Sequence, residues 1–421
     1  MRCVVPRRLP PGLLMPESNN IGLTHWTFDA QGLGSVDVEV VKSSESLAAL
    51  VDQLATEPCV GIDTEFLRER TYFAIAGLVQ IAIPGTVYLV DPMEVGDLCA
   101  LKPLLESPST RKVFHAAGED VQLLEHVAQC TMSNVFDTQI ACGYALDLPG
   151  AGYHALVESV CGVSLPKDAT RSDWLARPLE KAQLDYAALD AAYLIALAQY
   201  LDSALDKVAR TSWVEQENER ALRNHRRSLS ADFAWQRFKR IERLPVRAQH
   251  RLKWLATWRE QRAQQDDRPR GHVLPDRALV ALAKRDRVTG KALRDIDGLH
   301  PSTARRYGQA ACDAHTSAQQ ATAGKDLKPL LPQPAPEILS AQASIAKTAL
   351  AKKASSLKIS PELLSTRKQL EAWLTARICG VEPSPEILDW YSGWRQSIVR
   401  ECVEPQLDAD TKVSQNYSLE S

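Results

Sequence analysis

The chain has 421 residues, of which 45% are hydrophobic and 24% are charged, and its formal net charge is −2. This length predicts two to four domains with the composition of a globular protein. No apolar run approaches the ~20 residues of a membrane-spanning helix, so we expect no contact with a membrane. The nine cysteines form no C-x-x-C pair, which argues against a zinc site and for reduced thiols in the cytoplasm.

Charge is distributed unevenly along the chain. Residues 61–200 hold 9 Lys and Arg against 18 Asp and Glu, a net charge of −9. Residues 221–310 hold 22 Lys and Arg against 9 Asp and Glu, a net charge of +13. Basic residues often only solvate helix faces. A surplus of this size favours a metal-loading region followed by a region that binds a polyanion.

The first part of the chain predicts a mixed α/β domain. Residues 1–35 are expected to be a disordered extension, because four prolines interrupt its first half. From there to residue 225, short apolar runs alternate with amphipathic stretches. The expected strands are residues 59–63, 78–83, 87–91, 112–115 and 135–137, and the expected helices are residues 46–55, 120–128, 154–160 and 179–201. The segment Pro84-Gly85-Thr86 predicts a hairpin, so the sheet is expected to be mixed.

The rest of the chain predicts helices alone. Residues 240–322 form the first helical segment, in which Trp254, Leu255 and Trp258 have the spacing of core residues. A linker rich in Pro and Ala over residues 323–336 leads to a second helical segment, residues 337–405. We expect residues 406–421 to be a disordered tail.

Asp63 and Glu65 are the first candidate site residues, because they follow an apolar run that predicts a buried strand. Residues i and i+2 of a strand point to the same face. Two adjacent carboxylates repel each other, and a divalent cation would relieve this repulsion. The alternative to a metal site is a pair of solvent-exposed acids at the tip of the strand. Further acids that converge on the same place would argue against this alternative.

Two later motifs supply such acids. Asp120 begins a helix after His115 at a strand end, although it would also serve as a helix cap. Tyr186 and Asp190 are one turn apart on a helix face that is expected to be buried. A lone buried aspartate usually pairs with an arginine, whereas the three other acids favour shared metal ions.

The four acids fit a phosphodiesterase site with two divalent cations. Asp63 would bridge both ions, and Glu65 and Asp190 would hold the ion that activates water. Asp120 would hold the second ion, in part through water. Tyr186 would position the attacking water, and nearby cations would favour its phenolate form. A core tyrosine with a satisfied hydroxyl is the alternative.

The ordered motifs Asp63-x-Glu65, His115-x4-Asp120 and Tyr186-x3-Asp190 resemble those of the tyrosine subgroup of the DEDD exonuclease superfamily. Local sequences are similar to the ribonuclease D family, among them Arg70-Thr-Tyr, Phe136-Asp-Thr-Gln139, Ser172-Asp-Trp174, Trp258-Arg-Glu and Gly393-Trp-Arg395. The resemblance covers roughly residues 38–403. It implies an RNase H-like α/β exonuclease domain, with a mixed sheet flanked by helices, followed by two all-α HRDC-like domains associated with nucleic-acid binding.

The resemblance also implies an activity and a substrate. It implies two Mg²⁺ or Mn²⁺ ions per site and 3′–5′ hydrolysis of RNA that releases nucleoside 5′-monophosphates. The implied substrates are tRNA precursors and other small structured RNAs with single-stranded 3′ ends. We expect a cytoplasmic monomer. A DNA exonuclease, a non-catalytic RNA-binding scaffold and a nucleotidyl transferase are the alternatives, although the last lacks a G-x-x-x-x-G-K loop.

Three residues are candidates for contact with the substrate. Phe66 would stack on the terminal base or belong to the core. His115 would approach the scissile phosphate or be structural, and Arg171 would contact backbone phosphates. Lys167 and Arg177 lie near Arg171 in the sequence, with Asp173 as an alternative partner of Arg177. A basic cluster is expected to bind phosphates without reading sequence: Arg223, Arg226, Arg227, Arg237, Lys239 and Arg240.

Overall fold

The computed structural model describes residues 25–166, 172–288 and 299–409. The chain divides into two compact units. Unit 1 contains the residues up to Leu67 and Ala74–Leu222, and unit 2 contains Arg68–Phe73 together with the chain from Arg223 onward. Within the described residues, no helix is both long and apolar enough to cross a lipid bilayer. The eight described cysteines are all free thiols.

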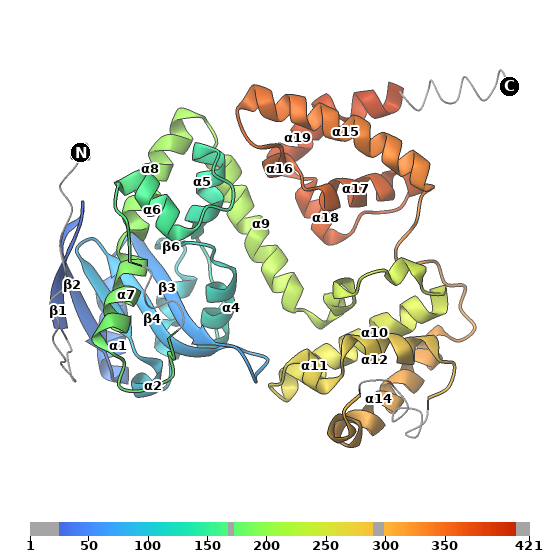
Figure 1. Ribbon diagram of the computed structural model, residues 1–421, viewed down its shortest axis with the longest axis horizontal. Helices are drawn as coiled ribbons and strands as arrows, with labels where there is room; N and C mark the ends of the chain where they lie inside the picture. Colours follow the sequence, from blue (N-terminus) through green and yellow to red (C-terminus); the bar gives the residue numbers. More distant parts are fainter. Residues whose placement is uncertain (1–24, 167–171, 289–298, 410–421) are drawn as a thin grey trace. The chain divides into compact units, whose positions relative to one another are not determined.

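Unit 1 is built on a seven-stranded mixed sheet with the strand order β1-β2-β5-β4-β3-β6-β7 (Figure 1). Its strands are β1 (His25–Ala30), β2 (Gly34–Val41), β3 (Cys59–Leu67), β4 (Ile75–Ile83), β5 (Thr86–Val90), β6 (Arg111–Phe114) and β7 (Val135–Asp137). The pairs β1/β2, β3/β4 and β4/β5 are antiparallel, whereas β2/β5, β3/β6 and β6/β7 are parallel. The predicted mixed sheet is therefore confirmed.

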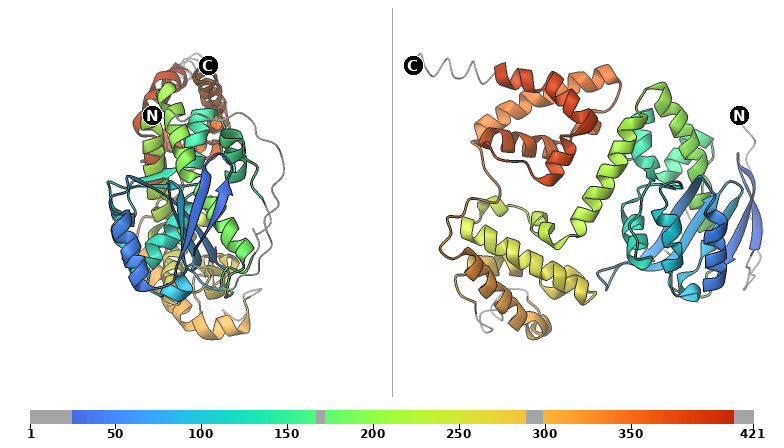
Figure 2. Two further views of the ribbon diagram at one scale, coloured as in Figure 1. Left: turned by 90° about the vertical axis from the view of Figure 1, so that its left-hand side faces the viewer. Right: turned by 180° about the vertical axis from the view of Figure 1, so that it is seen from behind.

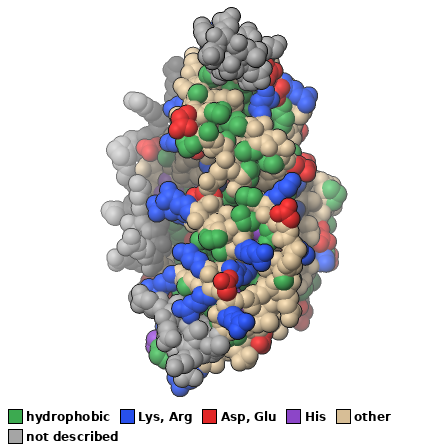
Figure 3. All heavy atoms as spheres, turned by 90° about the vertical axis from the view of Figure 1, so that its right-hand side faces the viewer, with side chains coloured by type: hydrophobic (Ala, Val, Ile, Leu, Met, Phe, Trp, Pro, Cys, Tyr) green, Lys and Arg blue, Asp and Glu red, His purple; other side chains and the backbone are tan. Residues whose placement is uncertain are grey.

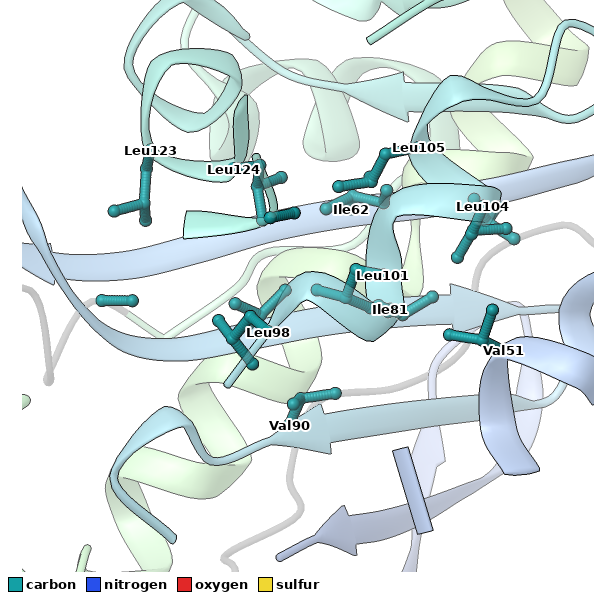
Figure 4. Packing of buried hydrophobic residues seen from close by; sticks show 14 of the residues in the cluster. Val51, Ile62, Ile81, Val90, Leu98, Leu101, Leu104, Leu105, Leu123 and Leu124 are labelled. Carbon is teal, nitrogen blue, oxygen red and sulfur yellow. The ribbon is translucent and has the colours of Figure 1, made fainter. Parts of the chain in front are cut away.

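Helices cover both faces of this sheet (Figures 1 and 2). The helices of unit 1 are α1 (Ser44–Leu54), α2 (Pro92–Val95), α3 (Lys102–Glu106), α4 (Gly118–Val127), α5 (Thr138–Leu146), α6 (Tyr153–Cys161), α7 (Lys181–Ala192), α8 (Leu194–Lys207) and the first part of α9 (Thr211–Leu229). Helices α1, α3 and α4 pack on one face through a leucine-rich core that includes Ile62 of β3, Ile81 of β4 and Val90 of β5 (Figure 4). Helices α7 and α8 pack against β3 and β4.

The start of the chain departs from the prediction. Residues 25–35, which were expected to be disordered, belong to an antiparallel hairpin of β1 and β2 that turns at Gly32 and Gly34, both with positive φ. The indole of Trp26 donates a hydrogen bond of 2.9 Å to Asp185 on α7, and Lys181 lies 4.7 Å from its ring centre. These partners are more than 150 residues away in the sequence, so the local proline pattern gave no sign of them.

Three further predictions of secondary structure need correction. The predicted helix over residues 179–201 is two helices, because Tyr193 ends α7 and its hydroxyl donates to the carbonyl of Gln31. Residues 406–409, predicted to be disordered, are helical, because Leu407 is fully buried. Trp254, predicted to lie in the core, is 47% exposed, while the adjacent Leu255 is fully buried. Trp258 packs partly buried against the core, as expected.

Unit 2 is helical beyond the segment Arg68–Phe73, as the sequence predicted (Figure 1). It contains the 3-10 helices η2 (Ala231–Arg237) and η3 (Ile241–Arg243) and the helices α10 (Val246–Gln265), α11 (Arg270–Val273), α12 (Asp276–Lys284), α14 (Pro301–Thr322), α15 (Pro336–Leu357), α16 (Pro361–Leu364), α17 (Arg367–Cys379), α18 (Pro385–Trp390) and α19 (Gly393–Cys402). The first helical domain packs around Leu255 and Leu279, and the second around the fully buried Trp390.

Candidate active site

Strand β3, an interior strand of the sheet between β4 and β6, carries the first two acids. β3 continues to Leu67, so Asp63 and Glu65 lie within the strand and not beyond its tip. They pair with Gln80 and Leu78 of β4, and a register shift follows directly after Glu65. Side chains alternate along a strand, so both carboxylates project from one face while Ile62 enters the core on the other.

The close approach of α8 to β3 depends on Gly61. A Cβ atom at this position would lie 2.9 Å from Cβ of Leu194 and 3.3 Å from the carbonyl oxygen of Ala191. The absence of a side chain therefore lets the junction of α7 and α8 pack directly on the strand that bears Asp63. This packing sets the position of Asp190, which lies one residue before Ala191.

Asp120 comes from the turn after β6. Ala116 has a φ of 61°, and the carboxylate of Asp137 accepts hydrogen bonds from the backbone amides of Ala116 and Ala117 at 3.0 and 2.9 Å. This turn begins α4, in whose first turn the side chain of Asp120 is buried. Its carboxylate accepts a hydrogen bond from the hydroxyl of Thr64, the residue between Asp63 and Glu65.

Tyr186 and Asp190 share a face of α7, as their spacing predicted. The hydroxyl of Tyr186 hydrogen-bonds to Asp190, and Nε2 of His154 on α6 lies 3.4 Å from Oδ1 of the same carboxylate. The side chain of Asp190 is only 13% exposed. The helix thus presents an acid whose described neighbours are a tyrosine, a histidine and other acids.

The carboxylates converge. Asp63, Glu65 and Asp190 each offer an oxygen within 4.8 Å of the oxygens of the other two, a spacing that suits a divalent cation. Asp120 lies outside this group of three, but its charge and those of Asp190 and Glu65 act on Asp63. The structure therefore brings the four predicted acids into one electrostatic cluster and groups three of them tightly.

Burial and mutual repulsion disfavour the charged forms of these acids. Burial, followed by the charges of Asp190 and Asp120, raises the pKa of Glu65 to about 8. Burial also raises the pKa of Asp120 to about 6, against the opposing hydrogen bond from Thr64. The pKa values of Asp63 and Asp190 are raised as well, mainly by burial. A divalent cation would replace the protons that these groups otherwise bind, so the residues fit a metal centre.

The phenolate form predicted for Tyr186 depends on bound cations, whereas the protein groups around its hydroxyl act in the opposite direction. Burial and then the charge of Asp190 raise the pKa of its hydroxyl above the ordinary value. The hydroxyl group is therefore a hydrogen-bond donor to Asp190 in this arrangement.

A pocket of about 470 Å³ opens beside the acids. Its lining includes Asp63, His115, Tyr186 and Asp190 from the predicted set. Two further lining residues, Tyr153 and His154, were not predicted. Both lie at the start of α6, which carries no acidic motif, so only the three-dimensional structure brings them to the site.

The three predicted substrate contacts have different outcomes. Phe66 is half-buried and packs against the core of unit 1, so it retains both of its predicted roles. Nδ1 of His115 lies 2.9 Å from the hydroxyl of Thr138, which donates its own proton to the carbonyl of Phe114. Nδ1 must therefore carry the proton in this bond, which leaves a lone pair on Nε2 when the ring is neutral. Arg171 lies outside the described residues, as does Lys167.

Arg177 has a structural role that the sequence did not reveal. Its guanidinium binds both carboxylate oxygens of Asp91, at 2.7 and 2.5 Å, and not Asp173. It also donates to the carbonyls of Gly77 and Trp174. Arg177 is thus fully occupied by protein groups, which argues against its predicted contact with RNA.

Two family models match the chain. A 3′–5′ exonuclease model matches residues 38–206, and an HRDC domain model matches residues 248–314. The fold and the acidic cluster accordingly define a metal-dependent 3′–5′ exonuclease domain followed by a helical HRDC domain.

Known proteins are similar to this chain over nearly their whole length. Ribonuclease D of Pseudomonas paraeruginosa is 32% identical over 361 residues, which cover 86% of this chain and 95% of that protein. Ribonuclease D of Xanthomonas oryzae is 32% identical over 365 residues, or 86% and 96% of the two chains. The crystal structure of Escherichia coli ribonuclease D, an exoribonuclease involved in structured RNA processing, has a TM-score of 0.78 and 27% identity, covering 88% of this chain and 99% of that one. The chain belongs to the ribonuclease D family and is a 3′–5′ exoribonuclease.

Proposed function

We propose that Asp63, Glu65, Asp120 and Asp190 hold two divalent cations, Mg²⁺ or Mn²⁺, at which nucleotides are removed one at a time from the 3′ end of RNA. The observation that carries this proposal is the close approach of three carboxylates from β3 and α7, with no described Lys or Arg among the residues that line the adjacent pocket. Two such cations would activate a water molecule and neutralise the negative charge that develops on the leaving oxygen.

The side chains have separate tasks in this proposal. The charges of the three other acids all act on Asp63, which makes it the candidate for a ligand shared by both cations. The hydroxyl of Thr64 holds the side chain of Asp120 by a hydrogen bond. The hydrogen bond from Tyr186 orients Asp190, and the same hydroxyl would help to position a water molecule for attack. His115 and Phe66 would contact the terminal nucleotide, because His115 lines the pocket and Phe66 follows Glu65 directly.

We propose that unit 2 binds the RNA upstream of the cleaved nucleotide. Lys and Arg side chains gather on the lower half of the face that Figure 3 shows, among hydrophobic side chains. In the predicted basic cluster, Arg227 pairs with Asp389 and Arg237 with Glu260, whereas Lys239 and Arg240 are exposed. Internal ion pairs therefore occupy part of the cluster, and its exposed members are the better candidates for phosphate contacts.

The exposed ring of Trp254 adds a stacking surface for a base. The exposed cations Arg247 and Lys253 lie on the same helix, α10. His250, one turn before Trp254, donates a 2.8 Å hydrogen bond to the carbonyl of Lys328, whose side chain is exposed. Aromatic rings among basic side chains suit single-stranded RNA.

The finer assignments rest on the same reasoning. We propose that tRNA precursors and similar small structured RNAs are the substrates, that the protein acts as a cytoplasmic monomer, and that residues 337–405 form a second HRDC-like domain. The helical fold of α15–α19 supports the last point.

The test uses a tRNA precursor with a 3′ extension and a label at its 5′ end. The wild-type protein with Mg²⁺ is expected to give a ladder that shortens from the 3′ end, with nucleoside 5′-monophosphates as product. EDTA and the Asp63→Asn variant should abolish the ladder, and Asp52→Asn, an exposed acid on α1, serves as the control. If the protein binds the RNA but does not shorten it in Mg²⁺ or Mn²⁺, the proposal fails and the protein is a non-catalytic RNA-binding scaffold. Equal cleavage of the matching DNA would show that the site does not select RNA.

A further inference from the structure

The turn that connects β3 and β4 has an unusual place in the molecule. Its residues, Arg68–Phe73, belong to unit 2, although the two strands that it joins belong to unit 1. Tyr72 is 5% exposed and forms a hydrophobic cluster with Ala263, Val273 and Tyr307 of the first helical domain. Tyr72, which follows strand β3, therefore forms part of the core of the first helical domain, whose contacting residues are nearly 200 positions further along the chain.

Polar contacts fix the Tyr72 side chain in this core. Its hydroxyl donates to the fully buried carboxylate of Glu260 and accepts hydrogen bonds from Gln264 at 3.0 Å and Arg270 at 2.9 Å. The guanidinium of Arg270 also lies 4.6 Å from the ring centre. Burial alone would raise the pKa of Glu260, but hydrogen bonds from Arg270 and Tyr72 and the charges of Arg270 and Arg237 hold the pKa below its ordinary value.

A second anchor holds the backbone of the turn. Oδ1 of Asp267 accepts hydrogen bonds from the amides of both Tyr72 and Phe73 at 3.0 Å. Asp267 itself has a φ of 45°, a left-handed conformation that aspartate tolerates better than most residues. The turn is thus held at a side chain and at two consecutive amides.

We propose that this clamp of Tyr72, Glu260 and Asp267 is a positioning device for the metal site. Only six residues separate the end of β3 at Leu67 from Ala74, where unit 1 resumes, so fixing Tyr72 limits the movement of the strand end. Glu65 lies two residues before that end, at the register shift that interrupts the regular pairing with β4. The first helical domain therefore contributes to catalysis by holding Glu65 in place, in addition to binding RNA.

This inference rests on the proposed metal site, and Tyr72→Phe tests it because the variant loses only the hydroxyl. The matched control is Tyr391→Phe, which loses a similar hydrogen bond to a glutamate, Glu404, in the second helical domain. Two readouts apply: calorimetric titration of the protein with MnCl₂ alone, and steady-state hydrolysis of a diribonucleotide. The short substrate makes the result independent of RNA contacts further along the strand.

For Tyr72→Phe we expect several-fold weaker Mn²⁺ binding and a several-fold lower kcat, with KM for the diribonucleotide nearly unchanged. Asp267→Gly, which removes the two amide contacts at an exposed position and suits the positive φ, should change Mn²⁺ affinity and kcat in the same direction. Tyr391→Phe should change neither quantity. If Tyr72→Phe and Asp267→Gly bind Mn²⁺ and turn over substrate as the wild type does, the clamp has no positioning role. If the wild-type protein neither binds Mn²⁺ nor cleaves the diribonucleotide, the result overturns the proposed function itself and not only the role of the clamp.

Discussion

Two clusters of buried carboxylates show opposite electrostatics. Glu260 in the helical unit is surrounded by Arg237, Arg270 and the hydroxyl of Tyr72, and its pKa is lowered despite complete burial. Glu65 in the exonuclease unit is surrounded by other acids, and its pKa is raised to about 8, by burial first and then by Asp190 and Asp120. The protein supplies the positive charge in the first cluster. In the second cluster no Lys or Arg is among the described residues that line the adjacent pocket, and the proposed metal site would supply the missing positive charge from solution.

The strongest way to break this comparison is to remove the central acid. Asp63→Asn keeps the size of the side chain but removes the charge that the proposed cations share. We expect exonuclease activity to fall by more than about a hundredfold, because even changes to groups behind metal ligands cost 10–100-fold. Initial rates on 5′-labelled RNA at saturating Mg²⁺ measure this effect. Activity within a few-fold of the Asp52→Asn control would remove Asp63 from the site.

Tyr186→Phe tests the contribution of the hydroxyl group that is hydrogen-bonded to Asp190. The variant keeps the ring but loses the hydrogen bond to Asp190, so we expect a kcat that is lower by about a hundredfold, the lower range for groups that assist proton transfer. The affinity for Mn²⁺ should change much less than in Asp63→Asn. If kcat is unchanged, Tyr186 is only a packing residue.

Glu260→Gln tests the first cluster through stability. The substitution leaves Arg237 and Arg270 without a negative partner, and because both side chains are about one-third exposed we expect a loss of about 2–3 kcal/mol in the free energy of unfolding. Urea denaturation followed by circular dichroism measures this loss. The exposed Glu382→Gln is the control. A loss below about 1 kcal/mol, as for a surface ion pair, would show that the cluster is not effectively buried.

The pH dependence of stability sharpens the comparison further. Glu65 and Asp120 have folded pKa values of about 8 and 6, above the ordinary values of 4.5 and 3.8. The folded state then binds more protons than the unfolded state, so without metal these groups lower the stability as pH rises from about 4 to 8. Mg²⁺ takes the place of the protons and should therefore raise the melting temperature more at pH 8 than at pH 6. Thermal melts in EDTA and in MgCl₂ at both values give the result, and an equal shift at both would contradict it.

The smallest effect on activity is expected from changes to the surface of unit 2 that is proposed to bind RNA. Trp254→Ala should raise KM for a long single-stranded RNA by about fivefold, which corresponds to about 1 kcal/mol, the lower end of the range for one base–aromatic stack. Hydrolysis of a diribonucleotide should stay unchanged. Tyr200→Ala, an exposed ring of unit 1, is the control, and an equal effect of both variants would argue against a specific stacking role.

The sequence predicted those features of the site that depend on local geometry. The i, i+2 spacing placed Asp63 and Glu65 on one face of a strand, and the i, i+4 spacing placed Tyr186 and Asp190 on one face of a helix. Features that depend on contacts between distant segments escaped prediction. The ion pair of Arg177 with Asp91 is one such contact, since neither residue has a local pattern that identifies the other.

The same distinction explains the errors in the fold. The hairpin of β1 and β2 is held to α7 by Trp26 and Asp185, and no local pattern in residues 25–35 identifies Asp185 as the partner of Trp26. Trp254 follows the spacing of a core residue, but its neighbour Leu255 occupies the core while the indole faces solvent. Periodicity identifies a helix and its approximate face, whereas the packing partners decide which residue at the edge of that face is covered.

The most direct test of the metal site is a crystal structure of the protein grown with MnCl₂, with anomalous diffraction data to locate the manganese. The proposed site predicts anomalous peaks among the carboxylates of Asp63, Glu65, Asp120 and Asp190, with Asp63 in contact with both ions. Peaks elsewhere, or no peak between β3 and α7 at saturating Mn²⁺, would contradict the claim that these acids exist to hold catalytic cations.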